Sequence, residues 1–134
     1  IIMADPARTL DIVTRLADLG VPLSIDDFGT GYSSLGYLKR LPVREIKIDK
    51  SFVINMATDE NDATIVRSTI DLAHNLGLKV VAEGVENQEA WEQLRALGCD
   101  AAQGYHLARP MGAAALNDWL RQAHGSTLAA AAVA

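Results

Sequence analysis

Short apolar segments alternate with longer amphipathic segments along this 134-residue chain. The short segments predict strands at 21–26, 44–49, 79–83 and 101–107. The amphipathic segments predict helices at 6–19, 34–41, 62–76, 88–97 and 111–123, most of them bounded by capping residues, glycine or proline. Such alternation is typical of an α/β fold with parallel strands and right-handed crossovers. Four βα units after a leading helix amount to about half of a (β/α)8 barrel, which needs about 250 residues.

The composition is that of a globular domain and excludes several functional classes. The chain is 49% hydrophobic and 22% charged, and its formal net charge is -5. Because it has no basic block, we expect no binding of long nucleic acid, although a small nucleotide remains compatible with a bound metal. Cys99 is the single cysteine, so an internal disulfide and a cysteine-based zinc site are excluded. No apolar run is long enough to span a membrane, and we expect a cytoplasmic location.

The two ends of the chain differ from its middle. The first residues do not resemble a natural N-terminus, so we expect the chain to be part of a longer protein. Residues 125–134 are alanine-rich and of low complexity, and we expect a tail there that follows a domain over 1–124.

Two adjacent carboxylates stand where the first predicted strand ends. Asp26 and Asp27 are followed at once by a loop that contains glycines and hydroxyl side chains. Adjacent carboxylates repel each other and raise each other's pKa unless a cation takes up the charge. Since α/β proteins bind ligands at the carboxyl ends of their strands, this pair predicts a metal site.

The other predicted strands also end in polar residues. Lys47 and Asp49 lie on one face of the second strand, Glu83 ends the third, and Gln103 lies in the fourth. The carboxyl ends of parallel strands share one rim, so these side chains should meet. Carboxylate and amide oxygens suit Mg²⁺ or Mn²⁺, and two such ions are the usual means of phosphodiester hydrolysis. Lys47 would then hold the attacking water or neutralise charge.

Each of these residues also has a purely structural interpretation. An Asp-Asp pair before a glycine loop is often a turn or a helix cap, Lys47 and Asp49 could form an ion pair inside a barrel, and Glu83 could face solvent. Convergence of all of them at one rim favours the metal site.

With these residues in place, the chain closely resembles the EAL family of cyclic-di-GMP phosphodiesterases. The matching segments are DDFGTGYSSL at 26–35, IKIDKSFV at 46–53, VVAEGVE at 80–86 and QGY at 103–105, with Pro110. The resemblance covers residues 1 to 122. It implies the C-terminal half of a modified TIM (β/α)8 barrel and hydrolysis of cyclic-di-GMP to linear pGpG with Mg²⁺ or Mn²⁺.

The resemblance also implies a role for each matching residue. Asp26, Asp27 and Glu83 correspond to metal ligands, with Asp26 able to bridge two ions. Lys47 corresponds to the lysine that positions the attacking water, Asp49 supports the site, and Gln103 corresponds to a glutamine near the second metal. The loop with Gly29, Thr30, Gly31 and Ser33 corresponds to one that couples metal binding, substrate binding and dimerisation, and Glu86 to the glutamate that anchors this loop.

The chain lacks the Glu-Ala-Leu signature of the family and two further ligands, an asparagine and a glutamate, which would all precede Ile1. We therefore expect a parent phosphodiesterase whose 134-residue piece is nearly inactive alone, since it would not hold the full ligand set. An open half barrel exposes sheet edges, so we also expect a homodimer or pairing with the missing half. GGDEF or sensor domains are compatible with the parent. Two other functions stay open: a degenerate module that binds cyclic-di-GMP or a protein without catalysis, and a structural half barrel.

Overall fold

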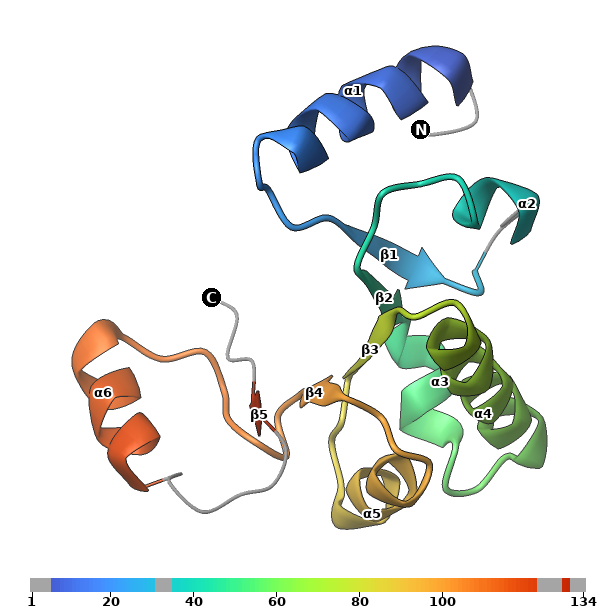
Figure 1. The fold of residues 1–134 in the computed structure, drawn as a ribbon. Helices are drawn as coiled ribbons and strands as arrows, with labels where there is room; N and C mark the ends of the chain where they lie inside the picture. Colours follow the sequence, from blue (N-terminus) through green and yellow to red (C-terminus); the bar gives the residue numbers. More distant parts are fainter. Residues whose placement is uncertain (1–5, 31–34, 123–128, 131–134) are drawn as a thin grey trace.

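Five parallel strands form the single sheet in the part of the chain that the computed structural model describes, residues 6–30, 35–122 and 129–130 (Figure 1). The strands lie in chain order: β1 (Ser24–Phe28), β2 (Glu45–Ile48), β3 (Lys79–Glu83), β4 (Ala101–Gln103) and β5 (Ala129–Ala130). Every neighbouring pair is parallel. The predicted α/β class with parallel strands is thereby confirmed.

Within the described residues, six helices connect or flank these strands. They are α1 (Pro6–Asp18), α2 (Leu35–Leu38), α3 (Lys50–Asn55), α4 (Glu60–Asn75), α5 (Gln88–Ala96) and α6 (Ala113–Gln122). Two of them, α4 and α5, begin where a side-chain oxygen accepts hydrogen bonds from backbone amides of the first turn. Asp59 accepts from Asn61 and Asp62 before α4, and Asn87 accepts from Ala90 before α5.

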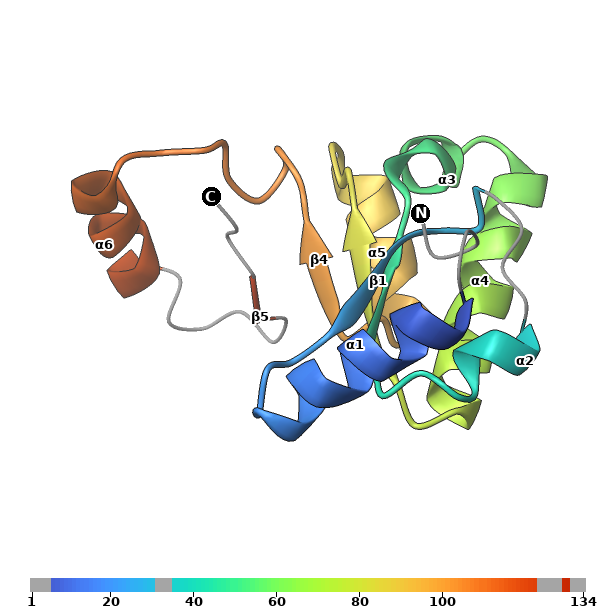
Figure 2. The same cartoon turned by 90° about the horizontal axis from the view of Figure 1, so that it is seen from above.

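The hydrophobic core lies between one face of the sheet and the helices α3, α4 and α5, which lie together on that side (Figure 2). Ile46 and Ile48 of β2 are fully buried there, as are Val66 of α4 and Leu94 of α5. Because side chains alternate along a strand, the same register turns Lys47 to the opposite face. This face carries the polar side chains that the sequence places at the strand ends.

Some predicted boundaries were wrong for identifiable reasons. β1 begins at Ser24 rather than at residue 21, beyond Pro22, which has no amide hydrogen to donate to a sheet. β4 ends at Gln103 rather than at 107 because the Gly104 carbonyl accepts hydrogen bonds from the Leu107 and Ala108 amides and turns the chain.

Two further elements were not predicted. Residues 50–55 form the helix α3, and residues 129–130 of the alanine-rich segment pair with β4. The remainder of that segment lies outside the described residues, and the division at residue 124 stays a prediction.

The helices α1 and α6 lie at the two ends of the sheet, apart from α3, α4 and α5 (Figure 1). No residue of α1 belongs to the main core cluster of buried side chains, and Ile12 and Leu16 on this helix are exposed. None of the described helices has the length and apolar character needed to cross a membrane.

Candidate metal site at the carboxyl edge of the sheet

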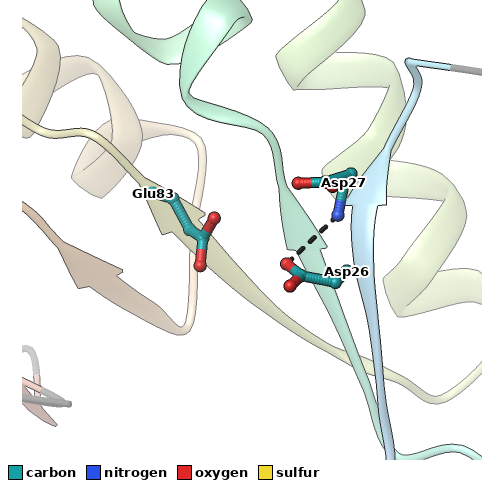
Figure 3. A group of neighbouring side chains, drawn as sticks. All are labelled: Asp26, Asp27 and Glu83. Carbon is teal, nitrogen blue, oxygen red and sulfur yellow. Dashed lines mark hydrogen bonds between the residues drawn. The ribbon is translucent and has the colours of Figure 1, made fainter. Parts of the chain in front are cut away.

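Three carboxylates meet where β1 and β3 end (Figure 3). Asp26, Asp27 and Glu83 each offer an oxygen, and these oxygens all lie within 4.8 Å of one another. Both aspartates are exposed and Glu83 is half-buried. The predicted convergence of these three side chains on one rim is therefore present in the structure.

An irregularity in β1 explains how two consecutive aspartates face the same space. Ile25 is paired with Ile46, but Phe28 is paired with Ile48, so β1 has one residue more than β2 over this stretch. In a regular strand Asp27 would follow Ile25 onto the core side. The extra residue acts as a bulge, and Asp27 adopts the left-handed conformation with φ 51°.

This backbone conformation is uncommon for a residue other than glycine, although aspartate tolerates it better than most. It costs about 1–2 kcal/mol relative to the ordinary helical region. Its effect is to leave Phe28 buried in the core while Asp27 stays at the rim. The Asp27 amide also donates a hydrogen bond of 3.1 Å to Asp26 Oδ1, which orients the first carboxylate.

Lys47 lies between the carboxylates of the two strands. Its Nζ atom is 3.4 Å from Asp26 Oδ1 and forms a second ion pair with Glu83 Oε1. The hydrogen bond with Glu83 is the main cause that raises the pKa of Lys47 above its ordinary value. Lys47 is therefore an ammonium group at neutral pH, which donates hydrogen bonds and cannot act as a general base.

Asp49 lies close to Asp27 and also caps a helix. It lies just beyond β2, where its carboxylate accepts a 2.9 Å hydrogen bond from the Ser51 amide and caps α3. Lys47 pairs with Asp26 and Glu83 rather than with Asp49, so the structural alternative of an ion pair between Lys47 and Asp49 is wrong. Hydrogen bonds from Ser51, first from its side chain and then from its backbone, lower the pKa of Asp49.

The donor set fits a divalent cation. The charge of Asp26 is the main cause that raises the pKa of Asp27, and Asp49 and Glu83 act in the same direction. Crowded carboxylates whose mutual repulsion is only partly offset by one ammonium group are stabilised when a cation binds. Exposed carboxylate oxygens are also the ligands that Mg²⁺ and Mn²⁺ prefer.

The remaining predicted residues lie next to the segments that carry the carboxylates or outside the described residues. Gln103 ends β4 directly opposite Glu83, and its carbonyl accepts a hydrogen bond from the Val85 amide.

In the loop after β1, Thr30 donates a hydrogen bond from its hydroxyl to the Asp27 carbonyl at 2.9 Å. Glu86 is exposed and makes no hydrogen bond or ion pair with the described residues. Gly31 and Ser33 lie outside the described residues, so the anchoring of this loop by Glu86 stays a prediction.

The helix α3 is the part of the site that sequence reasoning missed. The ring of Phe52 lies against Gly29, and Lys50 lies against Gly84, the residue after Glu83. A signal was present, because aspartate is a preferred N-cap residue and Asp49 directly follows a short strand. The helix is short enough that its apolar residues show little periodicity.

The family model of the EAL domain matches residues 2–110. The chain belongs to the EAL domain family. Among curated relatives, it is 52% identical over 109 residues to the bifunctional diguanylate cyclase/cyclic di-GMP phosphodiesterase MucR of Pseudomonas aeruginosa. This match covers 81% of this chain and 16% of MucR. It is 44% identical over 110 residues to the cyclic di-GMP phosphodiesterase RocR of the same organism, covering 82% of this chain and 28% of RocR. The chain thus spans less than a third of the length of these relatives.

Solved EAL structures share the fold. The cyclic-di-GMP complex of the PaMucR phosphodiesterase superposes with a TM-score of 0.82 at 51% identity, over 86% of this chain and 47% of that one. BlrP1 of Klebsiella pneumoniae, in a complex with manganese and cyclic-di-GMP, gives a TM-score of 0.75 at 35% identity, over 81% of this chain and 28% of that one. EAL domains form TIM barrels, and the predicted family and fold class are confirmed.

Proposed function

We propose that this chain carries part of the active site of a metal-dependent phosphodiesterase that hydrolyses cyclic-di-GMP to linear pGpG. The observation that carries the proposal is the meeting of three carboxylates within 4.8 Å, with the Lys47 ammonium between the strands that bear them. Relatives named as cyclic-di-GMP phosphodiesterases and an EAL structure in complex with cyclic-di-GMP support the choice of substrate.

Asp26, Asp27 and Glu83 would hold the cations, which we propose to be two ions of Mg²⁺ or Mn²⁺. The manganese complex of BlrP1 supports this choice of metal. When bound, such ions supply Lewis-acid activation of water and of the scissile phosphate. Three carboxylates cannot fill six positions around each of two ions. Substrate oxygens, water and ligands from beyond these 134 residues would complete the site, and we propose that this chain alone is nearly inactive.

The other side chains would act around these ligands. Lys47, held as an ammonium group by Glu83, would orient the attacking water by donating a hydrogen bond and would offset negative charge on the phosphate. Gln103, next to Glu83 in the sheet, would bind the same water or the substrate from the side of β4. Asp49 would act through α3, whose first turn it caps.

The decisive test is a chromatographic assay of pGpG released from cyclic-di-GMP in the presence of Mn²⁺. It compares this chain with a chain extended at its N-terminus to the length of the solved EAL domains. We expect turnover by the longer chain, and loss of that turnover in Asp26→Asn and Glu83→Gln, because each change weakens cation binding. Tight binding of cyclic-di-GMP without release of pGpG would instead identify a binding module. If the longer chain neither binds nor hydrolyses cyclic-di-GMP, only a structural role remains for the charged residues at the rim.

We further propose a cytoplasmic protein in which this region acts together with regulatory domains. The printed name of MucR includes a diguanylate cyclase, and another relative, DosP of Escherichia coli, is named an oxygen sensor protein. These names support GGDEF or sensor domains as partners within the same protein.

A further inference from the structure

The helix α3 touches both chain segments that leave the site carboxylates. Gly29, two residues after Asp27, has φ 102°, and a Cβ built on it would lie 3.0 Å from Cε2 of Phe52. Gly84 directly follows Glu83 and has φ 75°, and a Cβ there would lie 2.5 Å from the Lys50 Cβ. One helix therefore supports the backbone on both sides of the site.

Packing against the core, rather than intrinsic helix stability, holds α3 in place. Six residues are too few for a stable isolated helix. Val53 on its inner side and Met56, the residue directly after it, are buried, and the helix packs against α4 and β3. Asp49 adds a side-chain cap at its first turn. Since the core anchors α3, the two glycines that lie against it have little room to move toward it.

From this packing we infer that α3 is a spacer that sets the distance between the Asp26–Asp27 pair and Glu83, with Phe52 as a positioning residue. Asp27 has a strained backbone and its side chain is exposed, so its own packing does little to hold it in position. The Phe52 ring blocks the path along which the segment through Gly29 would relax. The Phe52 ring lies against Gly29, so it would act through the backbone that carries Asp27.

The expected effect of Phe52 on cation affinity rests on the proposed function. Residues that support metal ligands typically change metal affinity by about 10–100-fold when they are removed. We therefore expect Phe52→Ala to weaken Mn²⁺ binding by about tenfold. Phe52→Tyr keeps a ring in the same space, so we expect it to retain the affinity of the unmodified protein.

The experiment combines two measurements. Hydrogen exchange of peptides that cover β1 and Thr30 reports the mobility of the Asp27 segment without any metal. Calorimetric titration of the N-terminally extended chain with Mn²⁺ reports the affinity. The matched control is Leu72→Ala, which removes a half-buried apolar side chain from α4 near the opposite end of the sheet. Phe52→Leu, a smaller change, is measured beside Phe52→Ala so that a folded variant is available.

We expect faster exchange over β1 and Thr30 in Phe52→Ala and a smaller increase in Phe52→Leu. Phe52→Tyr should behave like the unmodified protein, and Leu72→Ala should lower the melting temperature while leaving exchange in this segment unchanged. Unchanged exchange in both Phe52→Ala and Phe52→Leu, or an equal increase in Leu72→Ala, would overturn the spacer role. Absence of Mn²⁺ binding by the N-terminally extended chain with no substitution would contradict the proposed function, whereas the exchange measurement would still decide the role of α3.

Discussion

Lys47 brings a positive charge to the rim where the carboxylates of β1 and β3 meet. Its ammonium group pairs with Asp26 and Glu83, two of the three carboxylates that a divalent cation would use. The lysine and the cation therefore compete electrostatically for these carboxylates, even though both are needed for the proposed chemistry. Removal of the ammonium group should separate the two effects.

We predict that Lys47→Met lowers kcat of the complete domain by about 100-fold or more, with little change in KM, because a hydrogen-bond donor to the attacking water is lost. Mn²⁺ affinity should stay equal or increase, since a competing cation has been removed. Steady-state kinetics and Mn²⁺ titration measure these quantities. Lys79→Met is the matched control, because Lys79 lies at the opposite end of β3. Loss of Mn²⁺ binding in Lys47→Met would contradict the competition.

Asp49 makes part of the stability of α3 dependent on pH. The hydrogen bonds of Ser51 lower its pKa from the ordinary value of 3.8, so the folded protein binds this proton less readily than the unfolded chain does. The resulting stabilisation is present above 3.8 and is lost as the pH falls through the lower pKa of the folded state.

We predict that Ser51→Ala lowers the free energy of unfolding by about 1 kcal/mol at neutral pH, because the hydroxyl no longer donates to Asp49. The difference from the unmodified protein should shrink as the pH falls below 3.8 toward the lower pKa of folded Asp49, because the unfolded chain takes up this proton first. Urea unfolding at a series of pH values measures it. Ser68→Ala, at an exposed position of α4, should show no such trend. If the difference in the free energy of unfolding stayed the same in acid, the hydrogen bond of Ser51 to the Asp49 carboxylate would not be its cause.

At the scale of elements, the turn after β4 is locked against the turn after β3. The Val85 amide donates to the Gln103 carbonyl, and the His106 amide donates to the Val85 carbonyl. A Cβ on Gly104 would collide with backbone atoms of Val85, including the carbonyl carbon at 2.6 Å. This close approach keeps the ends of β3 and β4, and therefore Glu83 and Gln103, next to each other.

We predict that Gly104→Ala destabilises the fold by about 3 kcal/mol, the upper part of the usual range for overpacking, because backbone on backbone cannot yield as a flexible side chain can. Gly112→Ala is the control, since a Cβ there meets nothing within 4 Å. Thermal or urea unfolding of both variants measures the difference. Equal stability of the two variants would show that the turns are not locked together.

Elements with a strong local pattern could be predicted from the sequence, and elements fixed by tertiary contacts could not. β3 was predicted at its observed bounds because a run of apolar residues follows the glycine that ends the preceding helix. The alternation in β2 correctly separated Lys47 from Ile46 and Ile48. By contrast, α3 has too few residues for a helical pattern, and the end of β4 depends on the turn at Gly104.

The site was partly predictable for the same reason. The carboxylates that end parallel strands must share a rim, so Asp26, Asp27 and Glu83 could be grouped from their positions alone. The bulge that turns Asp27 away from the core depends on how β1 pairs with β2, and no local pattern specifies this register. The additional role of Asp49 as the cap of α3 likewise depends on a helix that was not predicted.

At the scale of the whole molecule, the sheet has an open side. β1 pairs with β2 alone, so one row of its backbone amides and carbonyls lacks a neighbouring strand among the described residues. Apolar side chains are exposed beside it, with Leu19 at 79%, Ile12 at 46% and Val21 at 43%. An exposed strand edge next to apolar surface favours pairing with another chain.

We predict that a preparation of this 134-residue chain associates through the β1 edge, with a second copy as its partner. Size-exclusion chromatography with light scattering should show a mass that rises with concentration from monomer toward dimer. The double change Ile12→Lys with Leu19→Glu should shift the equilibrium to monomer, because charges beside an edge strand oppose pairing. Ile65→Lys on α4 is the matched control, as Ile65 is 38% exposed but lies on a helix that packs on the core side of the sheet. A well-folded monomer at every concentration would mean that the edge is stable without a partner.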